Sequence, residues 1–264
     1  MDESNATSPI AGDFLAVLKQ RRLISEVPVS FANRSEYKET VATTILGFKF
    51  TGGVLVAGDR RATAGNVVMY DRADKVLEID NRSVMAFAGS PATASEMARI
   101  LEHSFKFYRR SQLQEMSVEG KLRALSKLLR DNLGMVMQGV GVVVPLFATS
   151  DKKSSDPTKL FFYDAMGAQF EATDFASSGS GAPAVRSVLY YEQNWGRKPL
   201  RERTREDSIL LALKALDTAA EADTATGGID RHAKIFPIVK IVTESGVETV
   251  LSEKLAELYA AHVA

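Results

Sequence analysis

Apolar and polar positions alternate in several short segments near the start of the chain, and this period predicts strands. Residues 43–50, TTILGFKF, alternate and are rich in β-forming residues. Residues 54–58, VLVAG, follow after a short turn that contains two glycines, so the two segments predict a hairpin. Residues 75–79 and 84–88 predict a second pair of strands, joined by a polar turn.

Apolar positions spaced by three to four residues predict helices further along the chain. The first helix starts at Pro91, and a second runs from about Ser117 to Val136 with leucines at helical spacing. Three further helices are predicted over 183–192, 206–221 and 252–262.

The remaining strands are predicted from short β-rich runs between these helices. They cover residues 141–148, 159–164, 169–175, 236–243 and 247–251. Runs of strands therefore alternate with pairs of helices, which indicates an α+β fold of antiparallel sheets covered by helices, not regular βαβ units. The chain shows no internal repeat and no linker after residue 42, so residues 43–264 are predicted to form one domain.

Residues 1–42 differ from the rest of the chain in composition and in their lack of a regular apolar period. A small apolar cluster of Phe14, Leu15, Val17 and Leu18 precedes a charged stretch, and a polar segment without a sustained period follows. We interpret this part as a leader with at most one short helix; a disordered tail is the alternative.

Composition excludes several classes of function. The 33 basic and 33 acidic residues cancel, so nucleic acid is not an expected partner. The chain has no cysteine, which excludes disulfides, thiolate metal sites and a cysteine nucleophile. The three histidines are scattered, so no metal and no cofactor are expected. No apolar run reaches the roughly 20 residues that span a bilayer, and the acidic N-terminus is unlike a signal peptide. We therefore expect no membrane contact and a cytoplasmic location.

Candidate chemistry lies at the start of the first strand, where Thr43 and Thr44 follow Ala42. A threonine hydroxyl is a poor nucleophile without a base. An α-amino group, with a pKa of about 7.7–8.0, is a suitable base near neutral pH. If the chain began at Thr43, one residue would supply both groups. While Ala42 is attached the nitrogen is an amide and accepts no proton, which would explain the leader. Ordinary β propensity also accounts for two threonines that open a strand.

Two charged residues strengthen the catalytic interpretation. Asp59 ends the second strand and Lys75 begins the third, so both lie at the mouths of strands near Thr43. An ion pair there would place a positive charge that lowers the pKa of the Thr43 hydroxyl. Taken singly, each residue is more often a surface charge.

The motifs TTI, GDRRAT, DKV and the pair Ala88-Gly89, with their spacings, resemble a β-subunit of the 20S proteasome, most closely the actinobacterial type. The segments 179–181 (GSG) and 223–228 (DTATGG) resemble two further motifs of that family, and the resemblance covers essentially all of 43–264. It implies a four-layer αββα sandwich of the N-terminal nucleophile hydrolases.

The resemblance also implies roles for individual residues. Thr43 would be the nucleophile, Lys75 with Asp59 would set the charge, and the Gly89 N–H would form the oxyanion hole. A hydrogen-bond network around the Thr43 amine would consist of Ser180, Asp223 and Thr226. Position 226 departs from the family, where many members have serine; the hydroxyl is kept, but the added methyl group could shift the geometry.

By family register, the pocket for the residue before the cut would be lined by Ala62, Thr63, Ala73, Leu77, Phe87 and Ser95. Most of these residues are apolar and none is charged, which predicts a preference for apolar side chains. The alternative is that they belong to the core.

The resemblance implies partners as well. These are stacked heptameric rings with other β-subunits and separate α-subunits, an ATP-dependent unfoldase and unfolded protein substrates. The expected activity is that of a threonine endopeptidase, activated when Thr43 itself removes residues 1–42. Three alternatives stay open. An HslV-type protease has GDGQ where this chain has GDRR. A non-catalytic β-subunit would lack the threonine or the lysine, and a small-amide hydrolase of the same fold is more distant.

Overall fold

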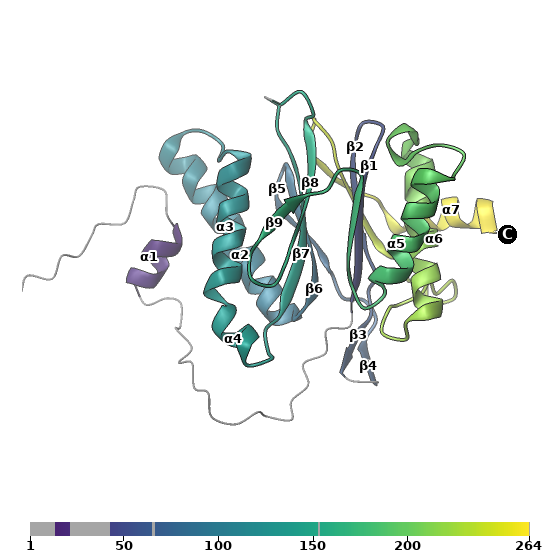
Figure 1. Ribbon diagram of the computed structural model, residues 1–264, viewed down its shortest axis with the longest axis horizontal. Coiled ribbons are helices and arrows are strands. Elements are labelled where there is room, and N and C mark those ends of the chain that lie inside the picture. Colours follow the sequence, from purple (N-terminus) through teal and green to yellow (C-terminus); the bar gives the residue numbers. More distant parts are fainter. Residues whose placement is uncertain (1–13, 22–42, 65–66, 153, 264) are drawn as a thin grey trace, which may run out of the picture.

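Two five-stranded antiparallel sheets pack face to face, and helices cover the outer face of each sheet (Figure 1). The computed structural model describes residues 14–21, 43–64, 67–152 and 154–263. The first sheet has the order β10-β1-β2-β11-β12 and the second the order β5-β6-β7-β8-β9. The first sheet consists of β1 (Thr44–Phe50), β2 (Gly53–Gly58), β10 (Phe175–Gly179), β11 (Ile238–Val242) and β12 (Val247–Thr249). The second consists of β5 (Val76–Asp80), β6 (Ser83–Gly89), β7 (Val143–Ser150), β8 (Thr158–Tyr163) and β9 (Gln169–Glu171).

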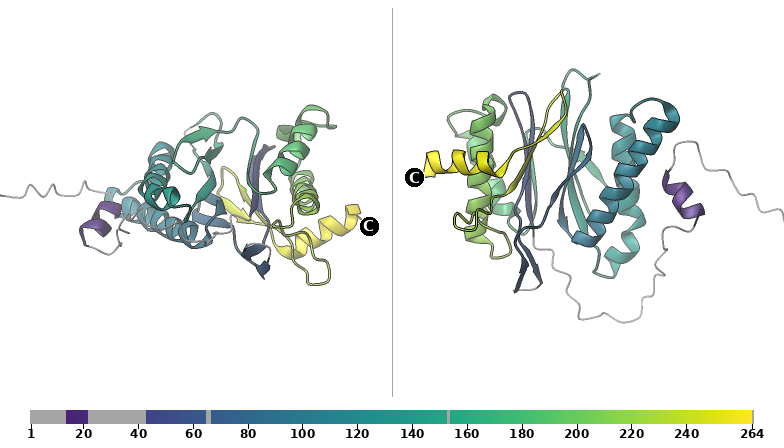
Figure 2. Two further views of the ribbon diagram at one scale, coloured as in Figure 1. Left: turned by 60° about the horizontal axis from the view of Figure 1, so that its bottom comes forward. Right: turned by 180° about the vertical axis from the view of Figure 1, so that it is seen from behind.

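The two helical layers lie on opposite sides of the paired sheets, as the view from behind in Figure 2 also shows. One layer contains α2 (Pro91–Gln112), α3 (Val118–Asp131) and the short α4 (Leu133–Met137). The other contains α5 (Ala182–Asn194), α6 (Arg205–Ala222) and α7 (Ser252–Val263), with a 3-10 turn over Leu200–Glu202 between α5 and α6. The predicted αββα sandwich is therefore confirmed.

Three apolar clusters hold these layers together. One fills the space between the sheets and includes Ile45, Val56 and Leu146. The other two lie between each sheet and its helices, where Leu46 packs toward α6 and Phe147 toward α2 and α3. Successive strand residues point to opposite faces, and both faces of a central strand are covered here. This is why every residue of β1 is buried and why its sequence is apolar or small at nearly every position.

Two boundary predictions were wrong. The strand predicted over 169–175 covers β9 and only the first residue of β10, because the chain crosses there from one sheet to the other. The Ala172 N–H still bonds to Leu160 in the second sheet, whereas the Asp174 carbonyl accepts from Lys49 in the first. The single helix predicted to reach Val136 ends at Asp131, where the Asn132 side chain donates to the Gly141 carbonyl at 2.6 Å and the chain restarts as α4.

A separate pair of strands was not predicted either. A two-stranded ribbon of β3 (Ala62–Ala64) and β4 (Val67–Tyr70) extends from the end of the first sheet (Figure 1). All four residues of β4 are exposed. A ribbon with no buried face lacks the alternation by which strands are predicted.

The described part of the predicted leader contains one helix, α1 (Phe14–Gln20), which lies against α2. The Phe14 ring is 5.7 Å from the Phe107 ring and 6.2 Å from the His103 ring, measured between centroids. The rest of the predicted leader lies outside the described residues. Among the described helices, none is long and apolar enough to cross a membrane. The residues that the structure describes contain no group of acidic and histidine side chains that could hold a metal ion.

Candidate active site

Thr43 lies at the entrance to β1 and is almost completely buried. Its carbonyl accepts a hydrogen bond from the Ser180 N–H at 3.0 Å, and the next residue, Thr44, pairs with Gly179 of β10. Gly179 has a φ of +100°, and a Cβ atom on it would lie 1.6 Å from the Thr43 carbonyl oxygen. Only glycine permits this approach, so the turn after β10 fixes the backbone of Thr43.

We expect Gly179→Ala to disrupt the site, because its methyl group would collide with the Thr43 carbonyl. The Gly52→Ala variant is a matched control: Gly52 also has a positive φ, +95°, but a Cβ atom there meets nothing within 4 Å. Gly52→Ala should therefore cost about 1 kcal/mol of stability and leave peptidase activity unchanged. Thermal unfolding and turnover of a fluorogenic peptide measure the two effects. Normal activity in Gly179→Ala would contradict this account of the turn.

A buried ion pair lies beside the start of β1. The Lys75 Nζ atom is 2.7 Å from Asp59 Oδ1, and both side chains are almost inaccessible to solvent. Lys75 also donates to the Arg61 carbonyl at 2.5 Å. Burial lowers the pKa of the Lys75 ammonium below its usual value, and the attraction of Asp59 reverses only part of that effect. The pairing expected from the sequence is therefore present, in a region where charge acts strongly because water is excluded.

The Asp59 carboxylate connects three further parts of the chain. It accepts backbone hydrogen bonds from Thr44 at 2.9 Å, from Arg61 at 2.9 Å and from Gly227 at 2.8 Å. These bonds, with the one from Lys75, satisfy both carboxylate oxygens inside the protein. Asp59 thus holds the lysine, the entrance to β1 and the loop after α6 in one arrangement.

Ser180, Asp223 and Thr226 form a second cluster. Ser180 and Thr226 donate to Asp223 Oδ2 at 2.5 and 2.6 Å. Burial by itself would raise the pKa of the Asp223 carboxyl, but the hydrogen bonds from Ser180, Thr226 and the Ala225 N–H together outweigh burial and hold the pKa below its usual value. Asp223 is thus kept ionised close to Ser180, whose N–H binds Thr43.

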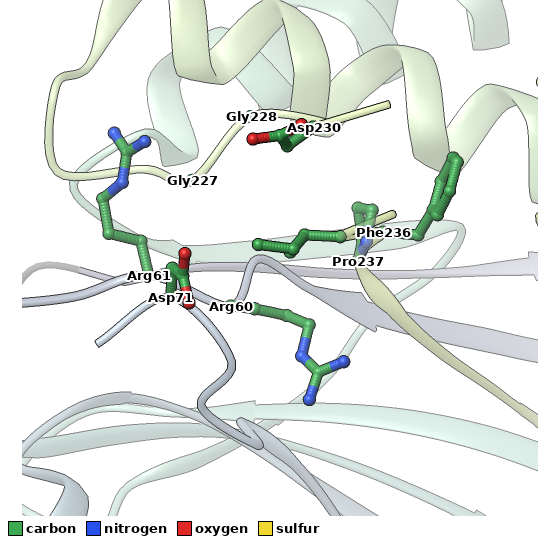
Figure 3. A pocket seen from close by; sticks show the side chains of 9 residues that line it. Arg60, Arg61, Asp71, Gly227, Gly228, Asp230, Phe236 and Pro237 are labelled. Carbon is green, nitrogen blue, oxygen red and sulfur yellow. The ribbon is translucent and has the colours of Figure 1, made fainter. Parts of the chain in front are cut away.

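Two residues of this arrangement were missed in the sequence. The Thr44 hydroxyl is 2.6 Å from the Thr226 hydroxyl and accepts from the Gly181 N–H at 2.9 Å. The Arg61 side chain donates from Nη1 to the carbonyls of Thr224 and Thr226. Figure 3 shows Arg61 reaching toward the loop that carries Gly227. The only available signal was their position, Thr44 next to Thr43 and Arg61 within GDRRAT.

Gly89 ends β6, in a backbone conformation with a φ of +118°. A Cβ atom on Gly89 would lie 2.0 Å from the Val142 carbonyl oxygen, so this position also requires glycine. Its role as an oxyanion hole remains a prediction.

Comparison with known proteins identifies the family. A family model described as proteasome subunit matches residues 40–235. The chain belongs to the proteasome family. A "Proteasome subunit beta" of Streptosporangium roseum is 39% identical over 228 residues, which cover 81% of this chain and 78% of that protein. One from Streptomyces griseus is 36% identical, covering 82% and 74%. One from Acidimicrobium ferrooxidans is 35% identical, covering 94% and 88%. The chain is thus similar to proteasome β-subunits and is a threonine endopeptidase by class.

The residues predicted by proteasome register to line a pocket lie in different surroundings. Five are partly buried, on or near β3, β5 and α2: Ala62, Thr63, Ala73, Leu77 and Ser95. Phe87 is 2% exposed and packs within the core between the second sheet and its helices. Replacing Phe87 by alanine would therefore cost about 3–5 kcal/mol of stability. Phe87 thus fits the alternative given above, that the residue belongs to the core, and the pocket itself stays a prediction.

Proposed function

We propose that residues 43–264 form the active threonine endopeptidase and that the hydroxyl of Thr43 is its nucleophile once residues 1–42 have been removed. The observation that carries this proposal is the buried Lys75–Asp59 ion pair, whose carboxylate also binds the N–H of Thr44. Burying the two charges of this pair costs free energy, which the fold must offset with close pairing and hydrogen bonds. Asp59 binds the N–H of the residue that directly follows Thr43, and this position supports a catalytic use of the pair.

In the mature chain the Thr43 amine would take the proton of its own hydroxyl as Oγ attacks the carbonyl carbon of a peptide. The Lys75 charge would stabilise the developing oxygen anion of Thr43, and the Gly89 N–H would stabilise that of the substrate carbonyl. The C–N bond of the substrate then breaks, the leaving amine takes the proton, and water hydrolyses the ester on Thr43. These steps need no cofactor.

Removal of the leader would use the same nucleophile. Thr43 Oγ would attack the carbonyl carbon of residue 42, forming an ester while the peptide C–N bond breaks and the nitrogen becomes the free amine. Water then hydrolyses the ester and releases residues 1–42. Sequencing the N-terminus of the assembled protein tests the proposal: Thr43 is expected as the first residue, and an active particle with an intact leader would overturn it.

The comparisons support a subunit of a larger particle, since its relatives are named proteasome subunits. We propose that the chain assembles with other β-subunits and with α-subunits in stacked heptameric rings. An unfoldase driven by ATP would deliver unfolded proteins to it in the cytoplasm.

We expect this particle to cleave after large apolar residues at least about tenfold faster than after Arg or Glu. None of the predicted lining residues is charged, so an apolar side chain gains by leaving water while a charged one loses hydration without a partner. A tenfold preference needs only about 1.4 kcal/mol of differential transition-state binding. A panel of fluorogenic peptides that differ at the residue before the cut measures it. Equal turnover after Arg or Glu would show that other residues build the pocket.

A further inference from the structure

The hydroxyl of Thr44 belongs to a buried chain of hydrogen bonds that leads to Asp223. Thr44 and Thr226 are both completely buried. The Gly181 N–H donates to Thr44 Oγ1 at 2.9 Å, Thr44 Oγ1 is 2.6 Å from Thr226 Oγ1, and Thr226 donates to Asp223 Oδ2 at 2.6 Å.

Counting protons gives this chain a direction. A hydroxyl has one hydrogen, and an ionised carboxylate only accepts. The Thr226 hydrogen is therefore committed to Asp223, so the Thr44 hydroxyl must be the donor in its contact with Thr226. The Thr44 hydroxyl accepts its own hydrogen bond from the Gly181 N–H, so it both accepts and donates. All the hydrogens point from Gly181 toward Asp223.

Thr44 also connects the two charged groups of the site. Its N–H donates to Asp59 Oδ1, the same oxygen that binds Lys75, while its hydroxyl supports Thr226 and through it Asp223. One residue thus contacts the ion pair through its backbone and the Asp223 network through its side chain. It follows Thr43 directly, so its position sets the geometry of both groups relative to the nucleophile.

We propose that Thr44 is a positioning residue of the peptidase, whose hydroxyl orients Thr226 and Asp223 around the Thr43 amine. This inference rests on the proposed function of Thr43. It also explains how threonine is accommodated at position 226: its hydroxyl accepts from Thr44 on one side and donates to Asp223 on the other, and these two bonds fix its direction.

The test compares Thr44→Val with Thr44→Ser in the assembled particle. Valine keeps the shape of threonine but has no hydroxyl, which leaves the Gly181 N–H without an acceptor and Thr226 without a donor. We expect kcat to fall about tenfold, equivalent to about 1.4 kcal/mol, with KM nearly unchanged. Thr44→Ser, which keeps the hydroxyl, should retain most of the kcat.

Thr149→Val is the matched control. Thr149 is also completely buried, and its hydroxyl bonds to Ser83 at 3.0 Å in the second sheet. Its loss should lower the melting temperature without changing kcat. If Thr44→Val does not assemble, Thr44→Cys, which has a weaker donor than serine, should give a kcat clearly below that of Thr44→Ser, and equal kcat values for these two variants would overturn the proposal.

A Thr44→Val particle with normal kcat, or a Thr44→Ser particle as impaired as Thr44→Val, would overturn the proposal. Failure of the underlying function has a different signature: Thr43→Ala would then keep its activity. An inactive Thr43→Ala together with a fully active Thr44→Val would refute only the positioning role.

Discussion

The Thr43→Ala protein is expected to fold, to keep residues 1–42 and to lose peptidase activity by at least about a thousandfold. Alanine removes the hydroxyl that would attack both the leader and the substrate, and no cysteine is present to replace it. The Thr43 side chain is small, and its backbone is fixed by Ser180 and by the turn at Gly179, so the fold should survive. Intact mass of the purified protein and turnover of a fluorogenic peptide measure the two effects.

Two companion variants sharpen this test. Thr43→Ser keeps a hydroxyl and should still remove the leader. A chain produced with Thr43 already at its N-terminus, for example by cleavage of a removable fusion, should be active without ever carrying the leader. Efficient cleavage of Thr43→Ala between residues 42 and 43, with no other active subunit present, would refute the assignment of Thr43 as the nucleophile.

Lys75→Ala is expected to reduce activity by at least about a hundredfold while the protein still folds. The positive charge beside the nucleophile is lost, and Asp59 is left as a buried negative charge that opposes formation of an oxygen anion. Lys75→Arg should not restore activity. The Lys75 ammonium fits between Asp59 Oδ1 at 2.7 Å and the Arg61 carbonyl at 2.5 Å, where the larger planar guanidinium has no equivalent place.

Lys121→Met provides the control for removing a buried lysine. Lys121 is also buried, and its Nζ atom lies 2.6 Å from Asp80 Oδ2 and 3.0 Å from Ser83 Oγ, in a different part of the fold. Its loss should reduce stability and leave kcat unchanged. If Lys75→Ala and Lys121→Met reduced activity equally, or if Lys75→Ala were nearly normal, Lys75 would have only a structural role.

The order of most strands and helices was determined by the sequence alone, since a strand or helix that buries one face shows its period in the apolar residues. Thr43, Asp59 and Lys75 could also be named as candidate site residues from the sequence. Each lies at or next to one end of a predicted strand. Thr43 and Asp59 flank strands of the first sheet, however, and Lys75 precedes β5 of the second, so their meeting depends on how the two sheets pack. The predicted Lys75–Asp59 ion pair is present in the structure. The catalytic roles remain predictions.

Only the tertiary structure decided where the chain passes from one sheet to the other. Residues 169–175 have a continuous β-forming pattern, and the break within them arises because Ala172 and Asp174 bond to strands of different sheets. Phe87 is a similar case. An apolar residue on a strand has the same local sequence whether it lines a pocket or fills the core, and its position among the buried residues of the second sheet and α2 depends on distant packing.

Thr44 shows most clearly what the sequence pattern cannot predict. Local sequence makes it an ordinary strand residue with good β propensity. Its hydroxyl meets Thr226, 182 residues further along the chain, and Gly181, 137 residues along, only after β1, β10 and α6 are assembled. Hydrogen-bond direction depends on which donors and acceptors are brought together and on how many protons each holds. No periodicity in the sequence records either quantity, whereas folding determines both.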